Sequence, residues 1–346
     1  MKRKKVLIED IAKEAGVSLA TVSQALNHPR EVNRKTRQKI LEICAQLDYI
    51  HKKASHKRHL NLAVLALDRY IPFTDFYGRV SVGVLEEAHK QGFNVILEPF
   101  TKDQDELPKA ISKNIIDGIL VLGPLPREHI LMLKQRNLPL VLCGHPVPGL
   151  ETHTVMPDGR AGMYEATKHL ISLGHKKIAF ISGGPIFDPV VADRLEGYRF
   201  AMFEAGLEIP KEYIAQADFI RYEASCAAVE KLMGLNSPPT ALLCISDPIA
   251  FIAYDYLSKK GVKIPKDISI MGFDDLPSTF YVTPYLPELT TIHVDVENLG
   301  KTAVKVLLDV IENPSAIAYR HTLPVHLVIR KSTAGPSTFG FIKGKS

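Results

Sequence analysis

The chain has 346 residues, of which 46% are hydrophobic and 23% are charged, an ordinary composition for a globular protein of more than one domain. No apolar run approaches the roughly 18 residues of a membrane span, and the basic start MKRKK lacks the apolar core of a signal peptide, so we expect a cytoplasmic protein. Four dispersed cysteines without a C-x-x-C pair predict buried thiols rather than a zinc site or disulfides.

Charge is unevenly distributed along the chain. Residues 1–60 carry 14 Lys and Arg against 6 Asp and Glu, a formal charge of +8, whereas the rest of the chain carries −3. A basic head on a mildly acidic body favours a polyanionic partner for the head. Charge alone leaves open the alternative of a solvated basic terminus without a partner.

The first 50 residues predict three short helices. Apolar residues recur with helical spacing from Ile8 to Ala15, and Gly16 is placed to end that helix. Ser18 is a suitable N-cap for a second helix, and a third is expected from about residue 33. Three short helices with a tight glycine turn between the first two match a helix-turn-helix.

The segment IEDIAKEAGVSLATVSQALN, followed by VNRKTRQKILEICAQLDYI, closely resembles the DNA-binding head of the lactose-repressor (LacI/GalR) family of bacterial transcription regulators. The resemblance implies that the second helix enters the major groove of operator DNA. The residues then expected to read base edges are Leu19, Ala20 and Gln24. The residues expected to contact phosphates, which fix register without reading sequence, are Thr21, Ser23 and Asn27.

Gln24 departs from the arginine that is usual at this position in the family. Arginine favours guanine, whereas a glutamine amide can pair with N6 and N7 of adenine. Leu19 and Ala20 offer only apolar contact, which suits a thymine methyl group. We therefore expect an operator half-site with adenine where relatives often carry guanine.

Residues 51–60 are expected to form an atypical basic linker. In the family this segment folds on DNA into a hinge helix whose leucine wedges into the minor groove and kinks the duplex. Here arginine stands at the wedge position and the usual Pro-Asn pair is absent, so kinking is not expected to carry over. The side chains predicted to hold phosphates, or else to be merely solvated, are Lys52, Lys53, Lys57 and Arg58.

The body, residues 61–335, alternates short apolar runs with helical stretches. The strand-like runs are LNLAVLAL, FNVILEP, DGILVLG, PLVLCG, KIAFISGG, TALLCIS and ISIMGF, and helices are expected near 78–91, 160–173, 193–205, 222–234 and 248–260. This alternation predicts an α/β fold with parallel sheets, and seven such units indicate two lobes.

The family resemblance also covers this body, as far as about residue 335. It implies a two-lobed, periplasmic-binding-protein-like domain for effector binding and dimerisation, with chain crossings near residues 158, 290 and 320. A small molecule, most often a sugar, would bind in the cleft. Residues 336–346 form a tail without leucine heptads, so no oligomer beyond a dimer is predicted.

The resemblance assigns roles in the cleft residue by residue. Arg194 would donate to ligand hydroxyls and Asp274 would accept from them. An aromatic side chain would cover the apolar face of a sugar. Besides Arg194 and Asp274, the predicted effector-binding residues are Phe219, Phe76, Tyr77, Asp158 and Ser246. Structural alternatives stay open, namely a plain ion pair between Arg194 and Asp274 and core positions for the three aromatic residues.

The sequence shows no signature of an enzyme. The dinucleotide-binding and phosphate-loop glycine patterns are absent, as are G-x-S-x-G and H-E-x-x-H, so we expect no catalysis, no metal and no cofactor. The prediction is a repressor that binds double-stranded operator DNA as a homodimer, responds to a small-molecule effector, and associates with the nucleoid when bound. The alternative is a cytosolic solute-binding or sugar-processing protein with a vestigial head.

Overall fold

The computed structural model describes residues 7–27, 32–47, 59–67, 76–101, 106–218, 221–277, 288–314 and 317–336. The chain divides into two compact units, Met1–His59 and Leu60–Ser346. The predicted linker residues 51–58 and tail residues 337–346 lie outside the described residues.

The first unit contains the three predicted helices, α1 (Ile8–Ala15), α2 (Leu19–Asn27) and α3 (Arg34–Gln46). Gly16 has a φ of 67° and ends α1 in the left-handed conformation that glycine adopts without strain. The Ser18 hydroxyl accepts from the backbone N–H of Thr21 at 3.1 Å, which confirms the predicted N-cap of α2. Ile11, Val22 and Ile40, one from each helix, are fully buried and form the centre of a small core.

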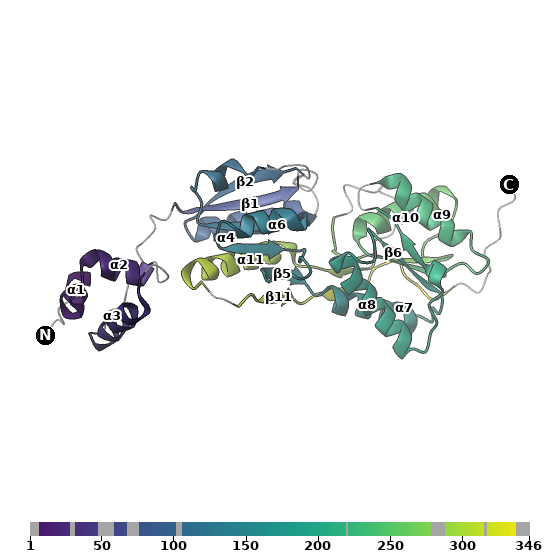
Figure 1. Cartoon of the computed structure of the whole chain (residues 1–346). Helices are drawn as coiled ribbons and strands as arrows, with labels where there is room; N and C mark the ends of the chain where they lie inside the picture. The colour runs from purple at the N-terminus through teal and green to yellow at the C-terminus, as the bar shows by residue number, and fades with distance from the viewer. Residues whose placement is uncertain are drawn as a thin grey trace. The chain divides into compact units, whose positions relative to one another are not determined.

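Lobe 1 of the second unit is built on a six-stranded parallel sheet (Figure 1). The strand order is β11-β5-β4-β3-β1-β2. In chain order the strands are β1 (Asn61–Leu67), β2 (Asn94–Phe100), β3 (Gly118–Leu122), β4 (Leu140–Cys143), β5 (His153–Pro157) and β11 (Arg320–Leu323). In the central register, Val64 of β1 pairs with Leu97 of β2 and with Leu120 of β3.

Alternation along β1 explains why this sheet is covered on both faces. Leu62 and Val64 pack with α4 (Phe76–Lys90) and α11 (Val296–Glu312), whereas Ala63 and Leu65 pack with α5 (Lys109–Ser112) and α6 (Arg127–Lys134). Successive side chains of a strand point to opposite faces, so a continuous apolar run predicts burial on both sides.

Lobe 2 is built on a four-stranded parallel sheet in the order β7-β6-β8-β9. Its strands are β6 (Ile178–Ser182), β7 (Ile214–Gln216), β8 (Ala241–Cys244) and β9 (Ser269–Met271). Helices α7 (Gly159–Ser172) and α8 (Pro189–Glu204) lie side by side on one face, and α9 (Tyr222–Met233) and α10 (Asp247–Lys259) cover the other (Figure 1). A short 3-10 helix, Lys211–Tyr213, precedes β7.

The chain crosses between the lobes at three places. It passes from β5 into α7 at Asp158, from β10 (Thr291–His293) into α11, and from β11 into β12 (His326–Val328). Strands β10 and β12 pair antiparallel, and the β10 region also bridges to Met271 and Asp274 of lobe 2. These positions agree closely with the expected crossings near 158, 290 and 320.

The predicted fold class is confirmed. All seven apolar runs form strands, and the five expected helices are present with ends shifted by a few residues. Cys44, Cys143 and Cys244 are buried free thiols as expected, whereas Cys226 is partly exposed. Within the described ranges, no helix combines the length and the apolar character needed to cross a membrane.

Candidate effector site and DNA-binding surface

A cavity of about 710 Å³ lies between the two lobes. It is lined largely by the segments that follow the carboxyl ends of parallel strands, including Pro124 after β3, His145 after β4, Gly183 after β6 and Ser246 after β8. Ligands of open parallel sheets bind at this edge, because the loops there converge. The volume suits a small organic molecule.

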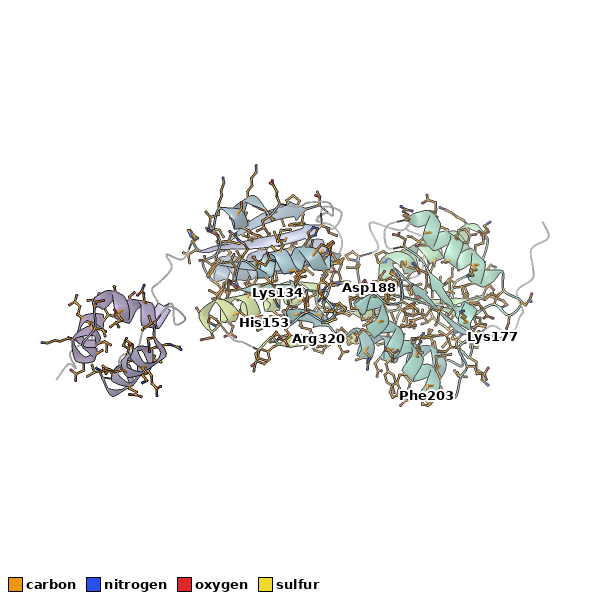
Figure 2. All side chains as sticks on the ribbon, viewed as in Figure 1. Lys134, His153, Lys177, Asp188, Phe203 and Arg320 are labelled. Atoms are coloured by element: carbon orange, nitrogen blue, oxygen red, sulfur yellow. The ribbon has the colours of Figure 1, made fainter. Side chains whose placement is uncertain are left out.

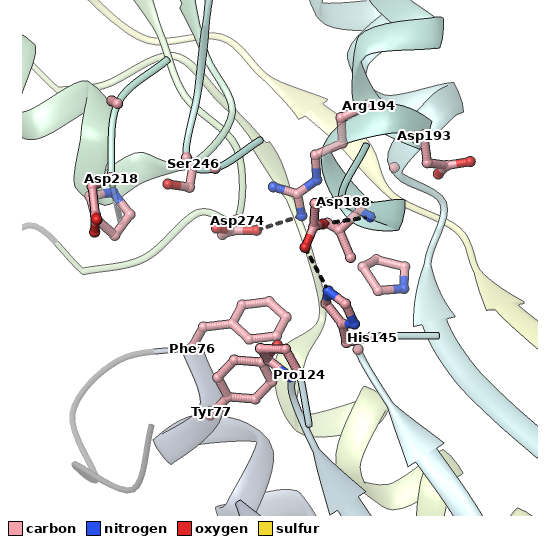
Figure 3. Close-up of a pocket in the computed structure, with 18 of the residues that line it drawn as sticks. Phe76, Tyr77, Pro124, His145, Asp188, Asp193, Arg194, Asp218, Ser246 and Asp274 are labelled. Atoms are coloured by element: carbon pink, nitrogen blue, oxygen red, sulfur yellow. Dashed lines mark hydrogen bonds and ion pairs between the residues drawn. The ribbon is translucent and has the colours of Figure 1, made fainter. Parts of the chain in front are cut away.

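Lobe 1 supplies an aromatic wall (Figure 3). The rings of Phe76 and Tyr77 meet edge to face, with centroids 5.1 Å apart and an interplanar angle of 81°. The Tyr77 ring lies against Gly123 and Gly144, where an added Cβ would come within 2.9 and 3.3 Å of it. Both glycines have positive φ, 76° and 83°, so they provide the turns as well as the space that seats the ring.

Lobe 2 supplies a polar wall centred on Arg194 of α8. One terminal nitrogen of Arg194 donates to Asp274 Oδ1 at 3.1 Å, and the other donates to the carbonyl of Ile245. The guanidinium lies 3.8 Å from the centroid of the Phe273 ring, a cation–π contact. Arg194 and Asp274 are each only 6% exposed, so this ion pair is held in a protein interior that borders the cavity.

Burial shapes the electrostatics of this wall. It raises the pKa of Asp274 to about 6, against the opposing charge and hydrogen bond of Arg194. Two further buried polar atoms, Arg194 Nε and Ser246 Oγ, have no hydrogen-bond partner among the described residues. Buried polar atoms are costly to leave unpaired, so these two are candidate contacts for a ligand.

His145 and Asp188 connect the walls directly. His145 Nε2 of lobe 1 lies 3.0 Å from Asp188 Oδ2 of lobe 2, and both residues line the cavity (Figure 3). Asp188 Oδ1 also accepts from the backbone N–H groups of Val190 and Val191, which caps α8. Burial acts to raise the pKa of Asp188, but the hydrogen bond and charge of His145 and the two N–H groups outweigh it and hold that pKa below its usual range.

The structure brings together most of the predicted effector residues. Phe76, Tyr77, Arg194, Ser246 and Asp274 all line the cavity, and the predicted alternative of an Arg194–Asp274 ion pair is also present. Asp158 is not among the lining residues, because its carboxylate caps α7 by accepting from Ala161 N–H at 2.9 Å. Phe219 lies outside the described residues. Contact with a ligand stays a prediction for each of them.

Five acidic and basic lining residues were missed by reasoning from the sequence, namely His145, Asp188, Asp193, Asp218 and Arg221. Their positions carried a usable signal, because His145 and Asp218 follow strands β4 and β7 by two residues. The Asp-Pro pair at 188–189 also marks a helix start, as aspartate is a strong N-cap and proline suits the first turn. Figure 2 shows Asp188 at the end of lobe 2 that faces lobe 1.

Helix α2 of the first unit has the two-sided character expected of a recognition helix. Val22 and Ala25 are buried against α1 and α3, whereas the predicted base readers Leu19, Ala20 and Gln24 are exposed. Thr21 and Ser23 are half-buried. The side chain of Asn27 and the linker residues 52, 53, 57 and 58 lie outside the part that the structure describes, so their phosphate contacts stay predictions.

Both units of the chain match models of known protein families. Residues 7–51 match the model of bacterial regulatory proteins of the lacI family, and residues 167–333 match a periplasmic binding protein-like domain. The HTH-type transcriptional repressor PurR of Actinobacillus pleuropneumoniae serotype 3 (strain JL03) is 32% identical over 335 residues, covering 94% of this chain and 97% of that protein. The chain belongs to the lacI family.

Two solved structures of transcriptional regulators resemble the chain. A complex of the transcriptional regulator CelR with cellobiose has a TM-score of 0.71 at 26% identity, covering 94% of this chain and 99% of that one. A LacI family regulator from Enterococcus faecium with bound ribose has a TM-score of 0.67 at 28% identity, covering 80% and 99%. The predicted function is therefore confirmed at the level of a DNA-binding transcriptional repressor whose operator affinity is modulated by a small molecule.

Proposed function

We propose that the effector of this lacI-family repressor is a sugar or sugar derivative that binds between the lobes. The observation that carries this proposal is the two-sided cavity, with the aromatic ring of Phe76 on lobe 1 and the polar groups of Arg194, Ser246 and Asp274 on lobe 2. Such a cavity suits a pyranose or furanose, which has an apolar face and a rim of hydroxyls. The bound cellobiose and ribose in the two similar structures support the same class.

Binding at this position would change the relation between the lobes. A ligand that contacts residues of both lobes favours the lobe arrangement in which both sets of contacts form. The same contacts would alter operator affinity, and operator binding would alter effector affinity by an equal factor. We infer that the repressor works as a homodimer, because two heads are needed for two half-sites of an operator.

On the DNA side, we infer that the exposed residues of α2 read the half-site. Leu19 and Ala20 would meet thymine methyl groups and Gln24 would pair with adenine. The exposed lysines and arginine of α3, Lys35, Arg37 and Lys39, lie in the same basic head and would supply charge for phosphates.

The test uses purified full-length protein. Selection from a random DNA library at a stated salt concentration should recover a palindromic site with adenine at the position read by Gln24. Binding of fluorescent operator is then measured across a panel of free sugars, with wild type and Arg194→Gln in parallel. At least one sugar should change operator affinity several-fold in the wild type and much less in the variant. Recovery of only sequence-independent, salt-sensitive binding, or an unaltered sugar response in Arg194→Gln, would contradict the proposal.

A further inference from the structure

The charged groups around the cavity indicate which sugars can enter it. Resting on the proposed sugar site, we propose that the effector is uncharged or carries an amine, and that phosphorylated and carboxylated sugars are excluded. The proposal follows from three features of the described residues: the balance of charge, the engagement of the buried cations, and the carboxylates that occupy the N-termini of α7 and α8.

Carboxylates outnumber cations on the cavity lining. The acidic residues are Asp188, Asp193, Asp218 and Asp274, and the basic ones are Arg194, Arg221 and His145. The formal charge is therefore −2 with a neutral imidazole and −1 with a protonated one. An anionic ligand would bring like charge next to these carboxylates, and such charges repel more strongly at a protein surface than in bulk solvent.

The buried cations are already engaged by the chain itself. Arg194 directs one N–H of each terminal nitrogen to Asp274 and to the Ile245 carbonyl, so its charge is already paired with a carboxylate and two of its five donors are taken. His145 is held by Asp188 at 3.0 Å. Among the described lining residues Arg221 is the remaining cation, but it is exposed at the start of α9, where solvent and salt screen its charge.

Helix N-termini are the other common binding sites for phosphate, because their free N–H groups point outward. Two of the helices that begin at this cavity, α7 and α8, have those groups occupied by carboxylates. At α8, Asp188 accepts from Val190 N–H and Val191 N–H at 2.9 and 3.2 Å. At α7, Asp193 accepts from the N–H of Arg160 at 3.1 Å, next to the cap provided by Asp158. The chain's own carboxylates thus stand where a phosphate would bind.

The groups that remain suit hydroxyls and amines. Ser246 Oγ can donate or accept, and Arg194 Nε can donate to a hydroxyl oxygen. Carboxylate oxygens on the lining can accept from hydroxyls, and they would attract an ammonium group. Around Asp188, Asp193 and Ser246 the cavity therefore offers acceptors and isolated donors rather than the cluster of donors that an anion needs.

The first arm of the test compares matched sugars on full-length protein by isothermal titration calorimetry. One set is D-glucose, D-glucosamine, D-glucuronate and D-glucose 6-phosphate, and a second is D-ribose and D-ribose 5-phosphate. Within any set that binds, we expect the neutral or amine member to bind at least about tenfold more tightly than its anionic counterpart, which corresponds to about 1.4 kcal/mol. An anionic member that binds as tightly or more tightly overturns the proposal.

The second arm does not depend on finding the sugar. The double variant Asp188→Asn/Asp193→Asn keeps acceptors at both helix caps but removes two charges from the cavity. Its matched control is Glu208→Gln/Glu212→Gln, which removes two charges from exposed positions of the same lobe. We expect inorganic phosphate, at constant ionic strength, to give a saturable thermal shift that is larger in the cavity variant than in the control and the wild type.

These arms separate the two proposals. Equal phosphate responses in all three proteins overturn the exclusion of anions by the cavity carboxylates, because any binding at the basic head is the same in each. If no sugar binds while the cavity variant alone gains a phosphate response, the sugar assignment fails and the exclusion of anions stands.

Discussion

Gly197 lies on α8 one turn beyond Arg194, at the point where α8 crosses closest to α7. A Cβ atom at this position would overlap the carbonyl oxygen of Arg160 and would lie 2.9 Å from the backbone nitrogen of Tyr164. Both are backbone atoms of α7, which cannot rotate away as a side chain can. The substitution Gly197→Ala therefore forces the two helices apart, and it shifts Arg194 relative to Asp274.

The size of the effect can be worked from this overlap. Overpacking of a well-packed interior typically costs about 1–3 kcal/mol, and a clash with backbone belongs at the upper end. Alanine returns about 1 kcal/mol through its better helix propensity. We expect the free energy of unfolding to fall by about 2 kcal/mol, which for the unit Leu60–Ser346 corresponds to a fall in Tm of about 3–4 °C.

The assay is thermal and urea unfolding of full-length Gly197→Ala beside Gly234→Ala. Gly234 is also a non-strained glycine at a helix, but the nearest atom to its added Cβ, the carbonyl oxygen of Glu230, is 3.4 Å away. This control should unfold within about 0.5 kcal/mol of the wild type. If the two variants unfold at the same temperature, the close approach of α7 and α8 does not constrain the protein as argued.

Three further outcomes are expected. Gln24→Arg should move the selected half-site base from adenine to guanine, with discrimination of about 1–3 kcal/mol, and an unchanged selected sequence would contradict the base assignment. Asp188→Ala removes a helix cap and the partner of His145, so the free energy of unfolding measured in urea should fall by at least about 1 kcal/mol. An unaltered urea midpoint would show that neither contact stabilises the protein. Burial raises the pKa of Asp274 to about 6, so the folded chain holds this proton more tightly than the unfolded chain, where the pKa is about 4. The contribution of this proton to the free energy of unfolding is fully present below about pH 4 and is lost as pH rises through about 6. In a series of urea titrations, the stability of wild type relative to Asp274→Asn should therefore fall across this window. A constant difference between the two proteins would refute the pKa shift.

Elements with a strong local pattern could be predicted from the sequence. The apolar runs became buried strands because a parallel sheet covered on both faces needs apolar residues at every position. Strands β5, β7, β10, β11 and β12 were not predicted, since segments such as HTVMP and RHTL mix polar and apolar residues. His153 and Thr154 of β5 are buried all the same, at 9% and 3% exposure, because neighbouring elements cover them.

The residues of the candidate site also divide into those that the sequence predicted and those that it did not. Arg194 and Asp274 were found through motifs shared with a family. They are 80 residues apart in the sequence, and the fold of lobe 2 brings them into contact. His145 and Asp188 belong to no motif and are 43 residues apart, so only the approach of the lobes brings them together. No spacing rule relates such a pair, although the position of each after a strand or before a helix marks it as a residue of the cleft.

Helix α8 combines three features described above. Asp188, at its start, contacts His145 of the opposite lobe, and Arg194, in its middle, belongs to the polar wall. Gly197, one turn later, packs against the backbone of α7. A straight helix moves as a rigid rod, so these three points cannot be adjusted separately. Substitutions on α8 that change the effector preference would therefore also change how readily the two lobes close. The aromatic wall lies on α4 of the other lobe, which takes no part in the His145–Asp188 contact, so changes there would alter ligand contacts without disturbing that contact.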